Sequence, residues 1–218
     1  MNYKLAVFDM DGTVLDTLQD LHVSCNVALE ATGYPLRTFE EIRSFVGNGI
    51  RNLMERIVPA GTAVAEIDRV HAAFMAHYSV HSADTTAPYA GVVDLLRELR
   101  EAGVLTAVVS NKAHAATVPL CGLYFPDLFD AIAGERESEG IPKKPAPDGV
   151  WGIMKELKVA AAEAVYIGDS EVDVATARNA GLDGIFVTWG FRTPAQLREA
   201  GATTIVDTTA EVKALILA

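Results

Sequence analysis

The residues of this chain that could do chemistry stand in four groups, and the first is a pair of aspartates. Asp9 and Asp11 follow the apolar run Leu5-Ala6-Val7-Phe8, and Gly12 marks a turn directly behind them. Paired carboxylates at the end of a buried strand suit a hard cation such as Mg²⁺, which takes oxygen ligands and retains waters and substrate phosphates. One carboxylate of such a pair can also attack an electrophile while the other transfers protons.

Two further groups carry hydroxyl, amide and ammonium functions. Ser110-Asn111-Lys112 follows the apolar run Leu105–Val109. At the start of a helix, such side chains and the free backbone N–H groups form an anion site, although Ser and Asn are also ordinary helix caps. Lys144 is followed by Pro145-Ala146-Pro147, and the prolines stiffen the backbone that carries its ammonium. An ammonium held in this way can neutralise a phosphoryl oxygen.

The fourth group is again acidic. Asp169 follows the apolar run Val165–Ile167, and Asp173 comes four residues later, one helical turn on. The two acids could complete a metal site or orient its waters. The alternative is that they only stabilise the start of a helix, because acids in the first turn interact favourably with the helix dipole.

The elements that must position these groups alternate between strand and helix. Short apolar runs predict six strands, at Lys4–Phe8, Leu105–Val109, Ala131–Ala133, Ala164–Ile167, Gly184–Val187 and Thr204–Val206. Apolar residues at helical spacing predict helices at Val92–Ala102, Val150–Leu157 and Val172–Asn179. Strands that alternate with helices indicate a parallel sheet with right-handed crossovers. We therefore predict an α/β, Rossmann-like, doubly wound core.

The segment between the first two strands departs from this alternation, because it contains only helical patterns. The predicted helices are Thr17–Ala31, Thr38–Phe45, Ile50–Ile57 and Val64–Val80. Thr38 and Glu41 have the spacing of a capping box. We predict that residues 17–83 form an all-helical cap domain inserted into a core made of residues 1–16 and 84–218. An insertion beside the end of the first strand is placed to act as a lid that excludes water.

Composition limits the classes of partner. The chain has 218 residues, half of them hydrophobic, and a formal net charge of −11, which argues against binding to nucleic acid or to an acidic membrane surface. No apolar run approaches the roughly 18 residues of a membrane span, and no signal peptide is visible. Cys25 and Cys121 lack metal or redox spacing, as expected of reduced thiols in a cytoplasmic protein. We expect a cytoplasmic monomer or homodimer.

Taken in order, the four groups resemble the four motifs of the haloacid dehalogenase superfamily, in its phosphatase branch. The segment from Asp9 to Thr17 matches the first motif, Ser110 the second, Lys144-Pro-x-Pro the third, and Gly168-Asp169-Ser170-x-x-Asp173 the fourth. The resemblance covers the whole chain, because the inserted helices stand where this family has a helical cap. It implies a Mg²⁺-dependent phosphatase that acts on a small phosphorylated metabolite through an aspartyl-phosphate.

The resemblance also implies a role for each motif residue. Asp9 is the nucleophile, and Asp11 is the general acid and then the base. Mg²⁺ is held by Asp9, Asp169 and the backbone carbonyl of Asp11, and Asp173 supports this site. The groups expected to hold the phosphoryl oxygens are the backbone at Gly12 and the side chains of Ser110, Asn111 and Lys144.

The choice of substrate is expected to lie in the cap. Gly47-Asn48-Gly49 and Arg51 resemble the glycine-rich loop of phosphoglycolate phosphatases, and Trp189-Gly190-Phe191 is also similar to that group. Gly47, Asn48 and Arg51 are therefore predicted to contact substrate, with Arg51 or Arg43 paired to a substrate carboxylate. The other interpretation is a connection between two helices without a ligand role. The leading substrate is 2-phosphoglycolate.

Other functions share parts of this pattern. A pyrophosphatase or a phosphosugar mutase of the β-phosphoglucomutase type would have the same four motifs. A haloacid dehalogenase needs no metal, so Asp11 and Asp169 argue against it. A phosphonate hydrolase would want a cap lysine, and residues 18–80 contain none. A phosphoacceptor regulatory module also clusters acids, a hydroxyl and a lysine around Mg²⁺, but such a module lacks a helical insertion of this length.

Overall fold

The computed structural model describes residues 3–218, which form two compact units. The first unit contains the chain up to Leu15 and from Pro88 onward, and the second is Asp16–Ala87. The second unit contains the predicted insertion, residues 17–83, and is longer than it at both ends. Within residues 3–218, no helix combines the length and the apolar composition that a membrane span requires.

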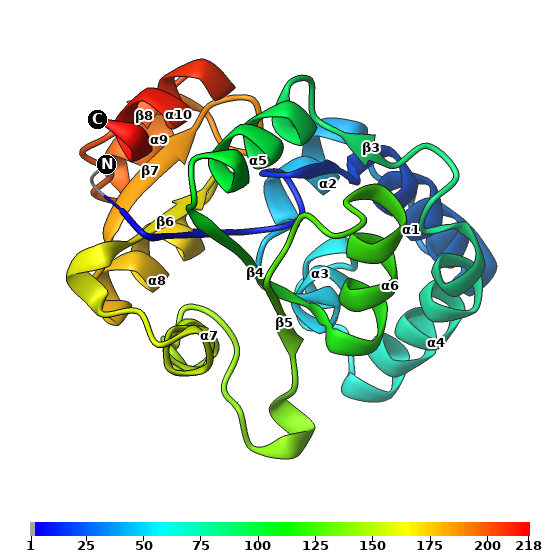
Figure 1. The fold of residues 1–218 in the computed structure, drawn as a ribbon. Helices are drawn as coiled ribbons and strands as arrows, with labels where there is room; N and C mark the ends of the chain where they lie inside the picture. The colour runs from blue at the N-terminus through cyan, green and yellow to red at the C-terminus, as the bar shows by residue number, and fades with distance from the viewer. Residues whose placement is uncertain (1–2) are drawn as a thin grey trace. The chain divides into compact units, whose positions relative to one another are not determined.

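The first unit is built on a six-stranded parallel sheet in the order β5-β4-β1-β6-β7-β8 (Figure 1). Its strands are β1 Leu5–Phe8, β4 Leu105–Ala113, β5 Ala131–Glu135, β6 Ala164–Gly168, β7 Asp183–Val187 and β8 Ile205–Val206. The α/β class and all six predicted strands are confirmed. One difference is that β4 continues past Val109, with an irregular register between Val109 and Ala113.

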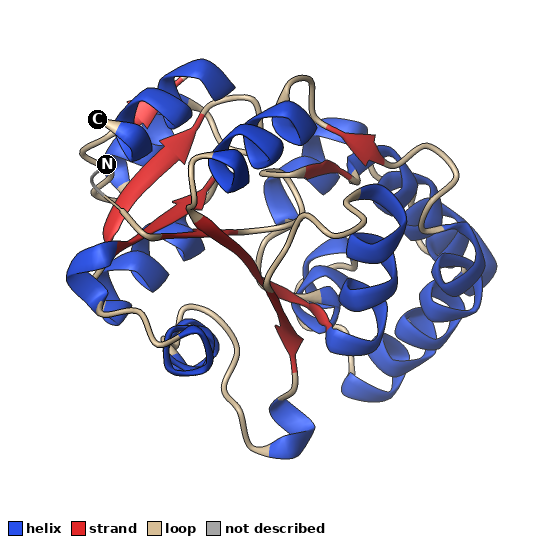
Figure 2. Ribbon diagram, in the orientation of Figure 1, coloured by secondary structure: helices blue, strands red, loops and turns tan. Residues whose placement is uncertain are grey.

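Helices cover both faces of this sheet (Figure 2). Side chains alternate between the faces, so that Ala6 and Phe8 of β1 pack in one core cluster, whereas Leu5 and Val7 pack in the other. The first cluster lies under α5 Val92–Glu101, α6 His114–Tyr124 and α10 Thr209–Leu217. The second lies under α7 Asp148–Leu157, α8 Glu171–Ala180 and α9 Pro194–Glu199. Short 3-10 turns are Glu137–Glu139 and Ala161–Glu163.

The strand order reverses direction beside β1. From β1 the chain builds outward through β4 and β5, and then returns to the other side of β1 for β6, β7 and β8. In open α/β sheets, ligands bind outside the carboxyl ends of the strands at such a reversal. Phe8 of β1 is in register with Val108 of β4 and Ile167 of β6. The residues directly after Phe8, Val108 and Ile167 therefore lie at about the same level of the sheet.

The second unit consists of α1 Leu18–Thr32, α2 Phe39–Phe45, α3 Ile50–Ile57 and α4 Val64–His81. Helix α1 packs along α4, and Thr38 and Glu41 form the predicted capping box at the start of α2. The two connections to the first unit pair as a short sheet of β2 Leu15–Asp16 and β3 Ala87–Pro88.

One buried aspartate, Asp20, joins the start of α1 to the segment after α4 in the second unit. The carboxylate of Asp20 accepts the backbone N–H and the hydroxyl of both Thr85 and Thr86, at distances between 2.5 and 3.1 Å. Burial acts to raise the pKa of Asp20, but these hydrogen bonds outweigh it and lower that pKa. The start of α1 is thus fastened to the segment that leads into β3.

Candidate active site

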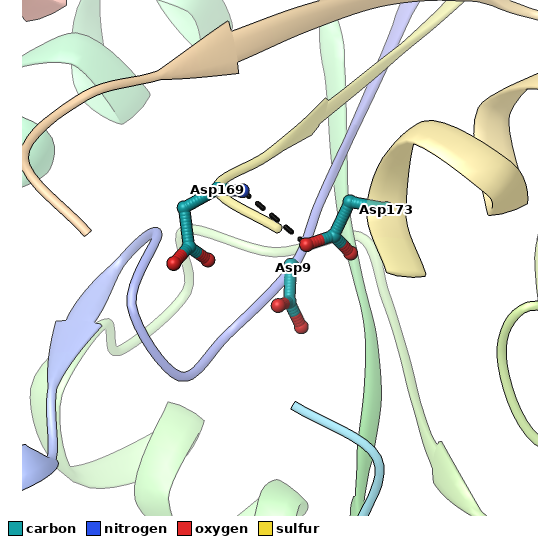
Figure 3. A group of neighbouring side chains, drawn as sticks. All are labelled: Asp9, Asp169 and Asp173. Atoms are coloured by element: carbon teal, nitrogen blue, oxygen red, sulfur yellow. Dashed lines mark hydrogen bonds between the residues drawn. The ribbon is translucent and has the colours of Figure 1, made fainter. Parts of the chain in front are cut away.

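Three aspartates converge at the carboxyl end of the sheet (Figure 3). Asp9 follows β1, Asp169 follows β6, and Asp173 lies in the first turn of α8. One carboxylate oxygen from each residue lies within 4.8 Å of the other two, and all three side chains are buried. The structure thus brings together acids that are far apart in the sequence, because β1 and β6 are neighbours in the sheet.

A buried lysine joins two of these acids. The Nζ of Lys144 lies 2.7 Å from Oδ1 of Asp9 and 2.8 Å from Oδ1 of Asp173. It also lies 3.1 Å from the hydroxyl of Tyr166, which donates to Asp173 at 3.0 Å. Burial acts to lower the pKa of Lys144, but the charges of Asp173 and Asp9 outweigh it and raise that pKa well above the usual value. Lys144 is therefore a fixed cation.

Both carboxylate oxygens of Asp173 accept hydrogen bonds from protein groups. Its Oδ1 accepts from Lys144 and Tyr166, and its Oδ2 accepts from the hydroxyl and the N–H of Ser170 and from the N–H of Asp169. Burial acts to raise the pKa of Asp173, but the Lys144 ammonium and these hydrogen bonds lower it. A carboxylate with this many donors is suited to orienting Lys144 and the start of α8.

The cluster has more negative charge than Lys144 can balance. When all three carboxylates are ionised, their negative charges outnumber the single ammonium by two in a buried space. Burial, together with the charge of Asp173, raises the pKa of Asp169 to about 7 and that of Asp9 well above its usual value. Clustered carboxylate oxygens with a charge excess of two are the donor set that a divalent cation takes. The residues present therefore fit a divalent metal.

The carboxylate of Asp11 is not part of this cluster. Its Oδ1 and Oδ2 lie 3.1 and 3.4 Å from Nζ of Lys112, which is buried. A metal role for Asp11 is thereby limited to its backbone carbonyl, which stays a prediction. The partner of Asp11 was not predicted, because a lysine directly after an apolar strand usually faces solvent.

The environment of Ser110 and Asn111 differs from the prediction. They lie within the extended end of β4 rather than at a helix start, and α6 begins only at His114, with Ala113 as its N-cap. The predicted helix start at these residues is therefore wrong, because β4 continues to Ala113 with an irregular register before the chain turns. The predicted contact of Ser110 and Asn111 with phosphoryl oxygens stays a prediction. The hydroxyl of Ser110 accepts the N–H of Lys112 at 3.1 Å, and the amide of Asn111 donates to the carbonyl of Lys144 at 3.1 Å. Asn111 thus fixes the backbone that presents Lys144.

Gly12 brings the loop after β1 against Asp169. Its φ is +94°, and a Cβ at this position would lie 2.5 Å from Oδ2 of Asp169. Only glycine combines this backbone conformation with so close an approach. The hydroxyl of Thr13 donates to Oδ1 of Asp169 at 3.0 Å, and the N–H of Phe191 donates to Oδ2 at 2.7 Å.

Of the predicted substrate residues of the cap, Gly47 and Asn48 lie between α2 and α3 of the second unit, and Arg51 lies in the first turn of α3. Gly47 and Gly49 have positive φ angles of 130° and 83°, and Gly49 is the N-cap of α3. Arg51 donates to Glu55 at 3.2 Å and to Asp68, so two acids of its own unit hold its guanidinium. The substrate roles of Gly47, Asn48 and Arg51 stay predictions.

The model of one protein family matches residues 6–187, and its description is haloacid dehalogenase-like hydrolase. The chain belongs to this family. A phosphoglycolate phosphatase from Cereibacter sphaeroides is 36% identical over 191 residues, with 85% of each chain covered. A solved structure from Lactobacillus delbrueckii subsp. bulgaricus, provisionally named a phosphoglycolate phosphatase, is 40% identical with a TM-score of 0.95, and 99% of each chain is covered. CbbY from Rhodobacter sphaeroides, solved with xylulose-1,5-bisphosphate, is 26% identical with a TM-score of 0.71, over 96% of each chain.

This haloacid dehalogenase-like hydrolase is a phosphatase, a phosphoric monoester hydrolase, as predicted. Phosphatases of the family generally use a divalent metal, and the three buried aspartates are an acidic cluster of the kind that holds one. Sequence reasoning missed Tyr166, although a buried tyrosine hydroxyl in a strand needs a polar partner nearby. It also missed the hydrogen bond from the N–H of Phe191 to Asp169, which no local sequence pattern predicts.

Proposed function

We propose that the chain hydrolyses a small phosphate monoester through an aspartyl-phosphate on Asp9, with Mg²⁺ as the metal and 2-phosphoglycolate as the leading substrate. The observation that carries the proposal is the cluster of Asp9, Asp169 and Asp173 around Lys144 at the reversal in strand order. Phosphoryl transfer asks little of a protein beyond positioning and charge compensation. A buried ammonium beside two carboxylates is such an arrangement.

The metal would be held by Asp9 and Asp169, and by the carbonyl of Asp11. When bound, Mg²⁺ supplies positive charge that lets an anionic carboxylate approach an anionic phosphate. Magnesium fits better than a metal that prefers thiolate or imidazole ligands, such as zinc or copper, because no sulfur or imidazole ligand is part of the cluster among residues 3–218. Asp173 serves this site through Lys144 and the backbone of Asp169.

Asp9 acts first in the proposed mechanism. A carboxylate oxygen of Asp9 attacks phosphorus, and the bond between phosphorus and the ester oxygen breaks. The ester oxygen leaves as an alcohol after Asp11 has given it a proton. Lys144, 2.7 Å from Oδ1 of Asp9, lies where it can balance charge on the transferred phosphoryl group.

Asp11 then acts as the base. A water attacks the aspartyl-phosphate, its proton passes to Asp11, and inorganic phosphate leaves as the carboxylate of Asp9 is regenerated. The ammonium of Lys112, 3.1 Å from Oδ1 of Asp11, orients this carboxylate.

The substrate is inferred from the relatives and from the cap. Relatives covered over most of their length are named phosphoglycolate phosphatase, including one from Thiobacillus denitrificans that is 32% identical over 98% of this chain. A substrate with a carboxylate also suits an arginine in the cap, since guanidinium and carboxylate pair in bidentate geometry. We propose Arg51 for this role, with its bonds to Glu55 and Asp68 exchanged for the substrate carboxylate.

A sugar phosphate is the second candidate. CbbY, whose chain is covered over 96% of its length, was solved with xylulose-1,5-bisphosphate, a substrate class with a second phosphate in place of a carboxylate. Three other predicted functions remain alternatives for the same residues. They are a pyrophosphatase, a β-phosphoglucomutase-like mutase, and a regulatory module that accepts phosphate without turnover.

The test is phosphate release from 2-phosphoglycolate, xylulose-1,5-bisphosphate, pyrophosphate, β-glucose-1-phosphate and p-nitrophenyl phosphate, each with Mg²⁺ and with EDTA. We expect Mg²⁺-dependent release with the highest kcat/KM on 2-phosphoglycolate. A higher value on the bisphosphate would move the assignment to sugar phosphates. Release that EDTA does not reduce would refute the metal, and conversion of β-glucose-1-phosphate without phosphate release would indicate the mutase.

A further inference from the structure

We propose that the turn Trp189–Phe191, directly after β7, is a positioning element that holds the carboxylate of Asp169 for metal binding. The inference rests on the proposed function, because it takes Asp169 as a metal ligand. These residues lie outside the four motifs, and they touch the site at Asp169 and at the loop after β1.

The first observation is that both oxygens of Asp169 have a fixed donor. The backbone N–H of Phe191 lies 2.7 Å from Oδ2, and the hydroxyl of Thr13 lies 3.0 Å from Oδ1. The Asp169 side chain is fully buried, so water cannot replace either donor. A carboxylate bonded at both ends keeps one orientation, which leaves a defined lone pair on each oxygen for a further ligand.

The second observation is that the turn has room for glycine alone at its centre. A Cβ on Gly190 would collide with the carbonyl oxygen of Gly12 and with the side chain of Asp169. The backbone of the turn therefore lies directly against both the loop after β1 and the proposed ligand. Gly12 approaches Asp169 from the opposite loop in the same way, so Asp169 is enclosed by two glycine backbones.

The third observation is that side chains lock the turn in place on either side. The indole N–H of Trp189 donates to the carbonyl of Thr13 at 3.0 Å. The guanidinium of Arg192, itself buried, donates to Glu171 at 2.7 and 3.1 Å, at the first residue of α8. The turn thus ties the loop that follows Asp9 to the helix that follows Asp169.

The function of this arrangement follows from the geometry that a small cation demands. Mg²⁺ tolerates little deviation in its ligand directions, so the separation between the oxygens of Asp9 and Asp169 must be held fixed. Groups that orient a metal ligand commonly change metal affinity by about 10–100-fold when they are removed. We therefore expect the turn to set the affinity for metal, while Lys144 and Asp9 remain in place.

The experiment compares two tryptophans in the full-length protein. Trp189→Phe removes the indole N–H that reaches Thr13, whereas the control Trp151→Phe removes an indole N–H that donates to Ala180 in a helix, at 3.3 Å. Mn²⁺ serves as the probe, and its binding is measured by electron paramagnetic resonance of the free ion. We expect the dissociation constant to rise about tenfold or more in Trp189→Phe and to stay at the wild-type value in Trp151→Phe.

A second pair of variants separates positioning from folding. Thr13→Val removes the donor to Oδ1 of Asp169, and Thr13→Ser retains it. We expect Thr13→Val to weaken Mn²⁺ binding about tenfold or more, Thr13→Ser to restore it, and both metal-free variants to keep the circular dichroism spectrum of the wild type. If Trp189→Phe and Thr13→Val bind Mn²⁺ as tightly as the wild type, the positioning role is refuted.

The outcome also distinguishes the two proposals. A wild-type protein that binds no Mn²⁺ would overturn the metal site and the positioning role together. A wild-type protein that binds Mn²⁺ but releases no phosphate from any ester would overturn only the proposed function, and the comparison of the variants would still decide the role of the turn.

Discussion

Replacement of the buried Lys144 should destabilise the protein, because the carboxylates around it would lose their balancing positive charge. In Lys144→Met, Asp9 and Asp173 lose an ammonium that lies 2.7 and 2.8 Å from their oxygens, and all of these groups are buried. Removal of one partner from a buried ion pair costs about 3–5 kcal/mol, because the remaining charge is left uncompensated. We expect the free energy of unfolding of the metal-free protein to fall by about that amount at pH 8.

The neighbouring lysine offers a matched control. Lys143 lies 2.9 Å from Glu137, but its side chain is 32% exposed and that of Glu137 is 49% exposed. An exposed ion pair of this kind contributes about 0–1 kcal/mol. Lys143→Met should therefore change the free energy of unfolding by less than about 1 kcal/mol. Urea unfolding followed by tryptophan fluorescence suits the comparison, because both tryptophans lie in the first unit.

The difference between the two variants should depend on pH. Burial, with the charge of Asp173, already raises the pKa of Asp9 and of Asp169, and loss of Lys144 removes a group that lowers the pKa of Asp9. A carboxyl group whose folded pKa is raised binds more protons when folded, so its penalty shrinks as the pH falls toward the unfolded value of about 4. The deficit of Lys144→Met should be smaller at pH 5 than at pH 8. Equal losses in the two variants, or a deficit that does not change with pH, would refute this account.

Four further predictions concern other parts of the molecule. Asp9→Asn should lower phosphate release more than about 10³-fold with an unchanged circular dichroism spectrum, because an amide cannot attack phosphorus; retained turnover would exclude Asp9 as the nucleophile. Arg51→Ala should raise KM about tenfold for 2-phosphoglycolate and little for p-nitrophenyl phosphate, and equal changes would remove Arg51 from substrate recognition. Asp20→Asn should lower the stability of the second unit by about 2 kcal/mol, because the NH₂ group of asparagine would face the N–H donors of Thr85 and Thr86. The measurement is amide hydrogen exchange at Thr85 and Thr86, which should become faster; unchanged exchange would contradict this prediction. Burial and the charge of Asp173 raise the pKa of Asp169 to about 7, so a metal competes with a proton there, and the dissociation constant for Mg²⁺ measured by calorimetry should rise as the pH falls from 8 to 6; a constant value would contradict the site.

Much of the core could be predicted from local patterns. Each strand is a short apolar run, and burial on both faces of a parallel sheet demands such runs whatever the surrounding fold. The capping box of Thr38 and Glu41 was predictable for the same reason, because its two hydrogen bonds join residues three positions apart. The motif residues after the strands were identifiable by type, since Asp9, Lys144 and Asp169 have a recognisable order along the chain.

The end of β4 shows where local reasoning fails. Serine and asparagine after an apolar run are typical of a helix cap, so the sequence predicts a helix start at Ser110. The strand instead continues to Ala113, with an irregular register where β4 pairs with β5. Pairing of β4 with β5 outweighs the local preference for a helix cap here. The residues of β5 lie too far along the chain from Ser110 for a short sequence pattern to include them.

Residue type and short-range pattern are enough to identify which chemical groups the site contains and after which strands they stand. The hydrogen-bond and ion-pair partners of those groups depend on the tertiary structure. The carboxylate of Asp11 turns to Lys112, 101 positions away, and Asp169 is held by Thr13, 156 positions away, and by Phe191. A buried carboxylate must find donors wherever the fold supplies them, and the donors that reach it are set by strand order and loop packing rather than by spacing along the chain.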